Sequence, residues 1–174
     1  MNKNTLFHLI LGLSQALVLT ATLLTASVNA QTSLPPEQFQ QGKASATELF
    51  DEGMRLFDEA GVGRDKSEAI AYFKAAGEQN NLQAQLMLGD MYAFGAGVAP
   101  DYTLAAYWFI KAAALGSPTA QLYMGDLYAN GLGVEKDLQK AIEYMAMAAS
   151  NPNADKESAA LAGKRLKALR EAVQ

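Results

Sequence analysis

From Ser45 onward, apolar residues recur at the spacing of one helix face, and the chain is rich in Ala, Leu and Met. No stretch alternates strictly between apolar and polar residues, as a half-buried strand would. The pattern therefore predicts an all-α fold. The preceding residues 31–44 are polar and contain a Pro-Pro pair, so we expect them to form a flexible leader.

The helical part repeats itself every 36 residues. Residues 89–113 and 125–149 are identical at eleven of twenty-five positions without a gap, far more than chance would give. A weaker copy lies another 36 residues back and starts at Gly53. Such a period is typical of helical repeat arrays, in which each unit is a helix, a loop and a second helix. We expect a degenerate first repeat at 45–81, a second at 82–117, a third at 118–153 and a capping helix at 154–174.

The sequence also indicates where the helices of each unit start and stop. We name the first helix of a unit helix A and the second helix B, and we expect helix A of the second unit over residues 82–94. Asp101 and Asp137 suit the N-cap of helix B, because a carboxylate there accepts from the open amides of the first turn. Asp65 and Glu68 form a capping-box pattern at the equivalent place in the first unit.

Glycine recurs in the middle of helix A, at Gly53, Gly89 and Gly125. A glycine there costs about 1 kcal/mol relative to alanine, so we expect packing to offset the loss. Without a Cβ atom, helix A can lie close against helix B. We expect the facing surface of helix B to be formed by its small residues Ala105, Ala112 and Ala113.

A second set of glycines lies between the helices. Gly116-Ser117-Pro118 combines a helix stop, a capping hydroxyl and a proline suited to the first helical position. In the loop between helices A and B, we expect positive φ angles at Gly95, Gly97, Gly131 and Gly133. A phosphate-binding loop is excluded here, because the stretch lacks G-x-x-x-x-G-K-[ST], no strand precedes it, and Asp101 would repel an anion.

These residues resemble the motif of the Sel-one-like repeat family, relatives of the tetratricopeptide repeats. The second unit matches at Ala84, Leu88, Gly89, Tyr92, Gly95, Gly97, Val98, Asp101, Ala105, Trp108, Lys111, Ala112, Ala113 and Gly116. The third unit retains Gly125 and Tyr128 but departs from the motif at Tyr144, Met147 and Pro152. The resemblance implies a right-handed α-solenoid with a concave face lined by the A helices, acting as a non-catalytic interaction scaffold.

The first thirty residues have the organisation of a signal peptide. Lys3 precedes an apolar run from about Leu9 to Leu24, and the segment closes on small residues ending at Ala30. We expect cleavage after Ala30, with a retained membrane anchor as the alternative. The mature chain would then be periplasmic or secreted and would have no membrane span.

Composition excludes several classes of chemistry. The sequence has no cysteine, and its one histidine, His8, lies in the N-terminal segment. Disulfides, structural zinc sites and His-dependent nucleophiles are therefore not expected, and neither is a cofactor. The mature part carries thirteen Lys and Arg against eighteen Asp and Glu, a net charge of −5 that disfavours nucleic acid as a partner.

The residues of helix A that packing does not require fall on a ridge spaced i, i+4, i+7 and i+11. A groove that combines apolar and acidic side chains would suit a basic amphipathic helix or an extended peptide from a partner protein in the cell envelope. The candidate partner-binding residues are Asp51, Asp58, Met87, Asp90, Phe94, Tyr123, Asp126 and Asn130. The alternative for the Met and aromatic residues is an ordinary place in the core.

Other functions remain open at this point. A cell-wall-acting enzyme would use paired carboxylates, although no pair stands out in the sequence. A cysteine-rich branch of the resembled family has been linked to β-lactam binding, an activity that this cysteine-free chain is not expected to share. A structural subunit of an envelope assembly is a further alternative to an adaptor with exchangeable partners.

Overall fold

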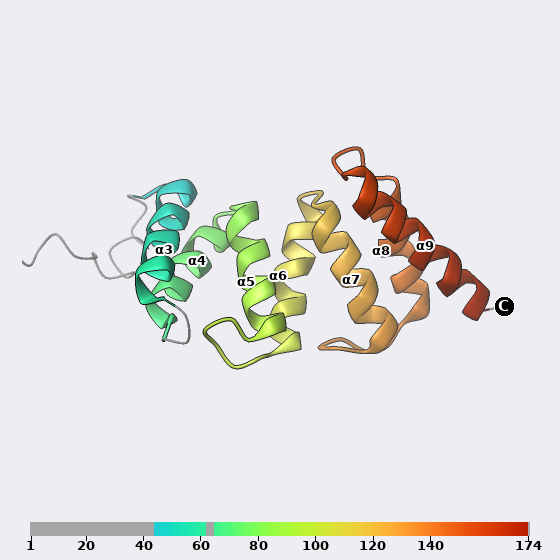
Figure 1. Cartoon of the computed structure of the whole chain (residues 1–174), viewed down its shortest axis with the longest axis horizontal. Coiled ribbons are helices and arrows are strands. Elements are labelled where there is room, and N and C mark those ends of the chain that lie inside the picture. The colour runs from blue at the N-terminus through green and yellow to red at the C-terminus, as the bar shows by residue number, and fades with distance from the viewer. Residues whose placement is uncertain (1–43, 62–64, 174) are drawn as a thin grey trace, which may run out of the picture. The chain divides into compact units, whose positions relative to one another are not determined.

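The computed structural model describes residues 44–61 and 65–173 (Figure 1). The expected signal peptide, and the leader up to residue 43, lie outside these residues. Within them the chain forms seven α-helices and no strand, which confirms the all-α prediction. The helices are α3 Ala46–Ala60, α4 Ser67–Glu78, α5 Leu82–Phe94, α6 Tyr102–Ala114, α7 Pro118–Asn130, α8 Leu138–Ala149 and α9 Lys156–Ala172.

Each helix packs on the next one along the chain, and α9 also contacts α7 (Figure 1). Helices α3, α5 and α7 are the A helices, and α4, α6 and α8 are their B partners. The main core cluster runs through all three pairs, from Ala69 on α4 to Leu127 on α7. Because burial is shared between neighbouring pairs, no pair encloses a core of its own.

The mid-helix glycines of the A helices receive large side chains from the B helices. A Cβ atom added at Gly89 would lie 2.6 Å from Cδ1 of Phe109, a separation that real Cβ atoms do not show. The same arrangement recurs one repeat away on either side. The equivalent pairs are Gly53 with Phe73, at 2.6 Å, and Gly125 with Met145, at 2.7 Å.

The expectation that alanines face these glycines is therefore wrong. Ala105, Ala112 and Ala113 are buried in the core, but the groups nearest to the missing Cβ of Gly89 are all atoms of the Phe109 ring. The missing side chain of the glycine thus leaves a notch that a ring fills. The close contact is between the Phe109 ring of helix B and the backbone of helix A, and not between the two backbones. This packing offsets the propensity cost of the glycine, since a fully buried ring contributes about 1.5–3 kcal/mol.

The loop glycines adopt the positive φ angles expected of them. Gly95 and Gly131 end α5 and α7 in the left-handed conformation, with φ of 75° and 72°. Gly97 and Gly133 lie against the start of the preceding helix B, at Lys66 and Tyr102 respectively. A Cβ at Gly133 would overlap the backbone of Tyr102, so this loop joins the third repeat to the second through direct contact.

Helix capping follows the prediction in the second and third repeats. Asp101 accepts hydrogen bonds from the amides of Thr103 and Leu104, and Asp137 accepts one from Lys140. The chain break between repeats also forms as expected, with Gly116 at φ 84° and Ser117 accepting from the amide of Ala120. Each cap is worth about 1 kcal/mol.

The predicted capping box at Asp65 and Glu68 is wrong. Helix α4 begins at Ser67 with Lys66 in the N-cap position, and among the described residues Asp65 accepts a hydrogen bond from the amide of Ser67 alone. Lys66 instead interacts with Phe57. Its Nζ atom lies 3.0 Å from the centroid of the Phe57 ring and donates a hydrogen bond to the Phe57 backbone carbonyl at 3.2 Å.

A capping box does form at the start of α3. Ser45 accepts from the amide of Glu48, whose carboxylate in turn accepts from the amide of Ser45.

The tyrosines of the second and third repeats lie in or beside the core. Tyr92 is buried, and Tyr128 is partly buried and stacked on Tyr144.

We expect Gly89→Ala to destabilise the protein by about 1–3 kcal/mol, because the added methyl group meets the buried Phe109 ring. The matched control is Gly163→Ala in α9, where nothing lies within 4 Å of the added Cβ. The control should raise stability by up to about 1 kcal/mol through helix propensity alone. Urea denaturation followed by circular dichroism compares the two. Equal midpoints for both variants would contradict the ring-in-notch packing.

Candidate functional site

The eight candidate partner-binding residues lie on the A helices with different degrees of exposure. Asp51 and Asp58 are exposed on α3. On α5 and α7, two further residues are exposed, Phe94 and Asn130, while the other four are half-buried: Met87, Asp90, Tyr123 and Asp126. The structure brings four of the eight into one cluster at the junction of the second and third repeats: Asp90, Phe94, Tyr123 and Asp126.

The aromatic part of this cluster is built on the Gly89 notch. Phe109, seated in the notch, stacks on Tyr123 with 4.7 Å between ring centroids. Tyr123 in turn meets the Phe94 ring edge to face at 6.1 Å. Phe94 is 66% exposed, the largest exposure among the big apolar residues that the structure describes. The packed core thus holds one face of Tyr123 and leaves Phe94 open to solvent.

Asp90 lies one helical turn before Phe94 on the same face of α5. Its Oδ1 atom is buried, and the carboxylate makes no hydrogen bond or ion pair within the described residues. Burial raises the pKa of Asp90 above its ordinary value of 3.8. Burial is also the main reason for the raised pKa of Tyr123, with smaller contributions from the charges of Asp90 and Asp126.

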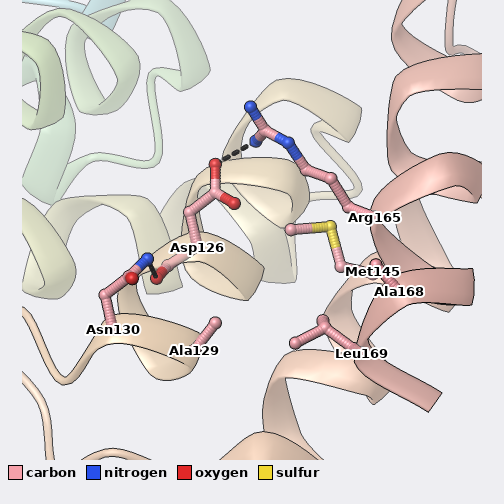
Figure 2. A pocket seen from close by; sticks show the side chains of 7 residues that line it. All are labelled: Asp126, Ala129, Asn130, Met145, Arg165, Ala168 and Leu169. Carbon is pink, nitrogen blue, oxygen red and sulfur yellow. Dashed lines mark hydrogen bonds and ion pairs between the residues drawn. The ribbon is translucent and has the colours of Figure 1, made fainter. Parts of the chain in front are cut away.

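Asp126 is the equivalent of Asp90 in the third repeat, and it has a partner. Arg165 of α9 donates to its Oδ2 atom (Figure 2). Burial raises the pKa of Asp126, and the Arg165 charge acts in the opposite direction. Asn130 donates to the Asp126 backbone carbonyl at 2.8 Å and so covers the C-terminal end of α7.

A pocket of about 490 Å³ lies beside this ion pair, between α7, α8 and α9 (Figure 2). Its wall is apolar apart from Asp126, Asn130 and Arg165, and Met145 contributes part of the floor. Met145 is the residue that fills the Gly125 notch where the other two repeats have phenylalanine.

The cluster has little in common with a metal centre. Within residues 44–61 and 65–173, no group of three or more His, Cys, Asp or Glu side chains is placed to hold a metal ion. In the same residues, no helix is both long enough and apolar enough to cross a membrane. The cluster thus places the Asp90 carboxylate, which pairs with no described residue, beside the exposed ring of Phe94.

Comparison with known families identifies the type of repeat in this helical array. The Sel1 repeat model matches residues 49–81, 82–117 and 118–153, which together make up more than half of the chain. The chain belongs to the Sel1 repeat family. Proteins built from Sel1 repeats generally act as protein–protein interaction scaffolds, and the fold is typically non-catalytic.

Solved structures support the assignment. The Sel1 repeat protein from Oxalobacter formigenes is 35% identical, with a TM-score of 0.59, and the match covers 71% of this chain and 88% of that one. The protective antigen c5321, present in uropathogenic Escherichia coli strains and displaying an SLR fold, is 33% identical with a TM-score of 0.55. That match covers 67% of this chain but only 26% of c5321.

Helicobacter pylori cysteine-rich protein B is similar in fold alone, at 21% identity and a TM-score of 0.50, with 69% of this chain and 98% of that one covered. A comparison with curated proteins gives no match. Together, the family match and the related structures confirm the predicted family and the repeat solenoid.

Two residues of the site were missed by sequence reasoning. Phe109 could have been found, because it lies 36 residues from Phe73 and shares its spacing from the mid-helix glycine. Arg165 gives no such signal. It belongs to α9, which departs from the 36-residue period, and its partner is fixed only by how α9 docks on α7.

We expect Asp90→Asn to stabilise the Sel1 chain at pH 7, because the folded state then no longer holds a half-buried, unpaired charge. Since the folded pKa is raised, the gain should shrink as the pH falls through it and vanish below the unfolded value near 3.8. Urea midpoints at pH 7 and pH 4 measure the difference. Glu143→Gln, an exposed carboxylate on α8, is the control and should change little. A loss of stability at pH 7 in Asp90→Asn would show that the charge has an internal partner.

Proposed function

We propose that this Sel1 chain is an exported, non-catalytic adaptor that binds a helix or an extended peptide of a cell-envelope partner along the A-helix ridge. The observation that carries the proposal is the exposed Phe94 ring, held against Tyr123 beside the Asp90 carboxylate, which pairs with none of the described residues. Aromatic residues that are rigidly supported by a core are typical anchors of protein interfaces.

The support beneath Phe94 distinguishes it from an incidental surface residue. Single exposed apolar side chains are common and need no explanation. Here, however, Phe94 continues a row of rings that starts in the core at Phe109 and passes through Tyr123. A partner that covers Phe94 therefore gains apolar contact without having to order a flexible surface first.

Charge favours a basic partner. The ridge carries Asp51 and Asp58 on α3 and Asp90 on α5, and none of the three forms an ion pair with a described residue. Complementary charge speeds encounter and fixes orientation more than it adds affinity. Met87 would contribute an adaptable apolar surface beside Phe94, in keeping with the use of methionine at binding surfaces.

Export rests on the sequence of the N-terminal segment. Its basic start, apolar run and small residues before the cleavage position at Ala30 have the order of a signal peptide. The absence of cysteine is compatible with any redox compartment.

We expect partner capture at Phe94. With a photo-crosslinking amino acid in place of Phe94, the full chain expressed in its own host should give a discrete adduct on irradiation. The control is the same amino acid in place of Met147, which is 47% exposed on α8 and lies off the ridge. An adduct at Met147 but none at Phe94 would refute the ridge as the binding surface.

We expect the mature chain to begin at Gln31. Cell fractionation followed by N-terminal sequencing should find this terminus in the periplasm or the medium. Changing Ala30→Leu should block processing, because signal peptidase requires a small residue before the cleaved bond. A chain that keeps its first thirty residues and stays with the membrane would identify an anchor instead.

A further inference from the structure

Asp90 and Asp126 occupy the same place in consecutive A helices, 36 residues apart. Both are half-buried, and burial raises the pKa of both. Their surroundings differ in one respect. Asp126 receives Arg165 from α9, whereas Asp90 receives no cation from any described residue.

The reason lies in the helix that comes after each aspartate on the A side of the array. The helix after α5 is α7, and the helix after α7 is α9. Residues 158–163 of α9 correspond to residues 120–125 of α7 at an offset of 38, so Arg165 corresponds to Leu127. Leu127 is buried and apolar, and it can give Asp90 no charge.

Among the basic residues of the first two repeats that the structure describes, none supplies the missing partner, because each of them is engaged elsewhere. Arg55 pairs with Glu52 and Glu59, and Lys111 pairs with Glu78. The remaining two lie over aromatic rings, Lys66 over Phe57 and Lys74 over Tyr92.

We propose that Asp90 binds an arginine of the partner segment, in the manner in which Asp126 binds Arg165. The inference rests on the proposed function of the ridge and specifies the chemistry of its ligand. Arg165 serves as the internal precedent, since it shows that a guanidinium group can reach this position of an A helix from a neighbouring element.

The surroundings of Asp90 favour arginine over lysine. Phe94 lies one turn away on the same helix, and Tyr123 lies beside both. A planar guanidinium can donate to the carboxylate and stack on a ring at the same time, while an ammonium group is more strongly hydrated and does neither as well. Because Oδ1 of Asp90 is buried, water competes less for this carboxylate, and a charge-assisted hydrogen bond to it is stronger.

A displayed library of random twelve-residue peptides tests the proposal. It is selected in parallel on the full wild-type chain, on Asp90→Asn and on Phe94→Ala. Wild type should enrich arginine beside apolar residues. Asp90→Asn should lose the arginine preference but keep the apolar one, and Phe94→Ala should lose the selected peptides altogether.

A second measurement makes the assignment quantitative. The tightest selected peptide is synthesised with arginine and with citrulline, which has the same shape but no charge. We expect the citrulline peptide to bind wild type about tenfold or more weakly, and to bind Asp90→Asn as well as the arginine peptide does. Glu143→Gln is the matched control and should keep the tenfold difference.

The possible results distinguish the arginine site from the ridge as a whole. Selected peptides that depend on Phe94 but show no arginine preference, or a citrulline penalty that persists in Asp90→Asn, would overturn the assignment of Asp90 and leave the ridge intact. Failure to select any peptide, or selection that is indifferent to Phe94→Ala, would overturn the ridge itself and the assignment with it.

Discussion

Both the fold and the site depend on a ring seated on a glycine. In the second repeat, the notch at Gly89 admits Phe109 to the backbone of helix A, which fixes the separation of the two helices. The same ring stacks on Tyr123, and Tyr123 supports Phe94 at the surface. The position of the exposed aromatic residue is therefore set by core packing, and a change in the notch would be felt at the ridge.

The notch of the third repeat holds a different side chain, and its surroundings change accordingly. Met145 takes the place of phenylalanine above Gly125, and its flexible side chain carries no ring to stack upon. A pocket opens beside it, and the neighbouring carboxylate is paired with Arg165. In the third repeat, the A-helix aspartate Asp126 is thus neutralised by Arg165 of α9. In the second repeat, the exposed Phe94 presents an aromatic surface instead. This difference explains why equivalent positions on α5 and α7 have different surroundings.

Much of the fold could be predicted because the sequence repeats every 36 residues, and each repeat forms the same pair of helices. The period locates the helices, and local chemistry at Asp101, Asp137 and Gly116 fixes their ends. The predicted capping box at Asp65 was wrong, because another local interaction competes with it. Lys66 is held by Phe57 and takes the N-cap position, which leaves Asp65 outside the cap. The prediction was also wrong about the glycine notches, since small residues and rings occur on the same helix B and spacing alone does not show which one faces the glycine. The Asp126–Arg165 pair was beyond sequence reasoning, because it depends on the docking of a helix outside the period.

The break between repeats has a consequence for the growth of such arrays. Gly116, Ser117 and Pro118 stop one unit and start the next through local caps, and Asn151 at the end of that next unit donates to the carbonyl oxygen of Gly116. The loop glycine at Gly133 lies against the backbone of the unit before it. A unit of this kind can be duplicated without redesign of its neighbours. Because the Tyr123 that supports Phe94 belongs to the third repeat, the second and third repeats would have to be copied together to bring a further Asp90 beside a supported Phe94. Lengthening the array in this way would raise its valency for a repetitive ligand.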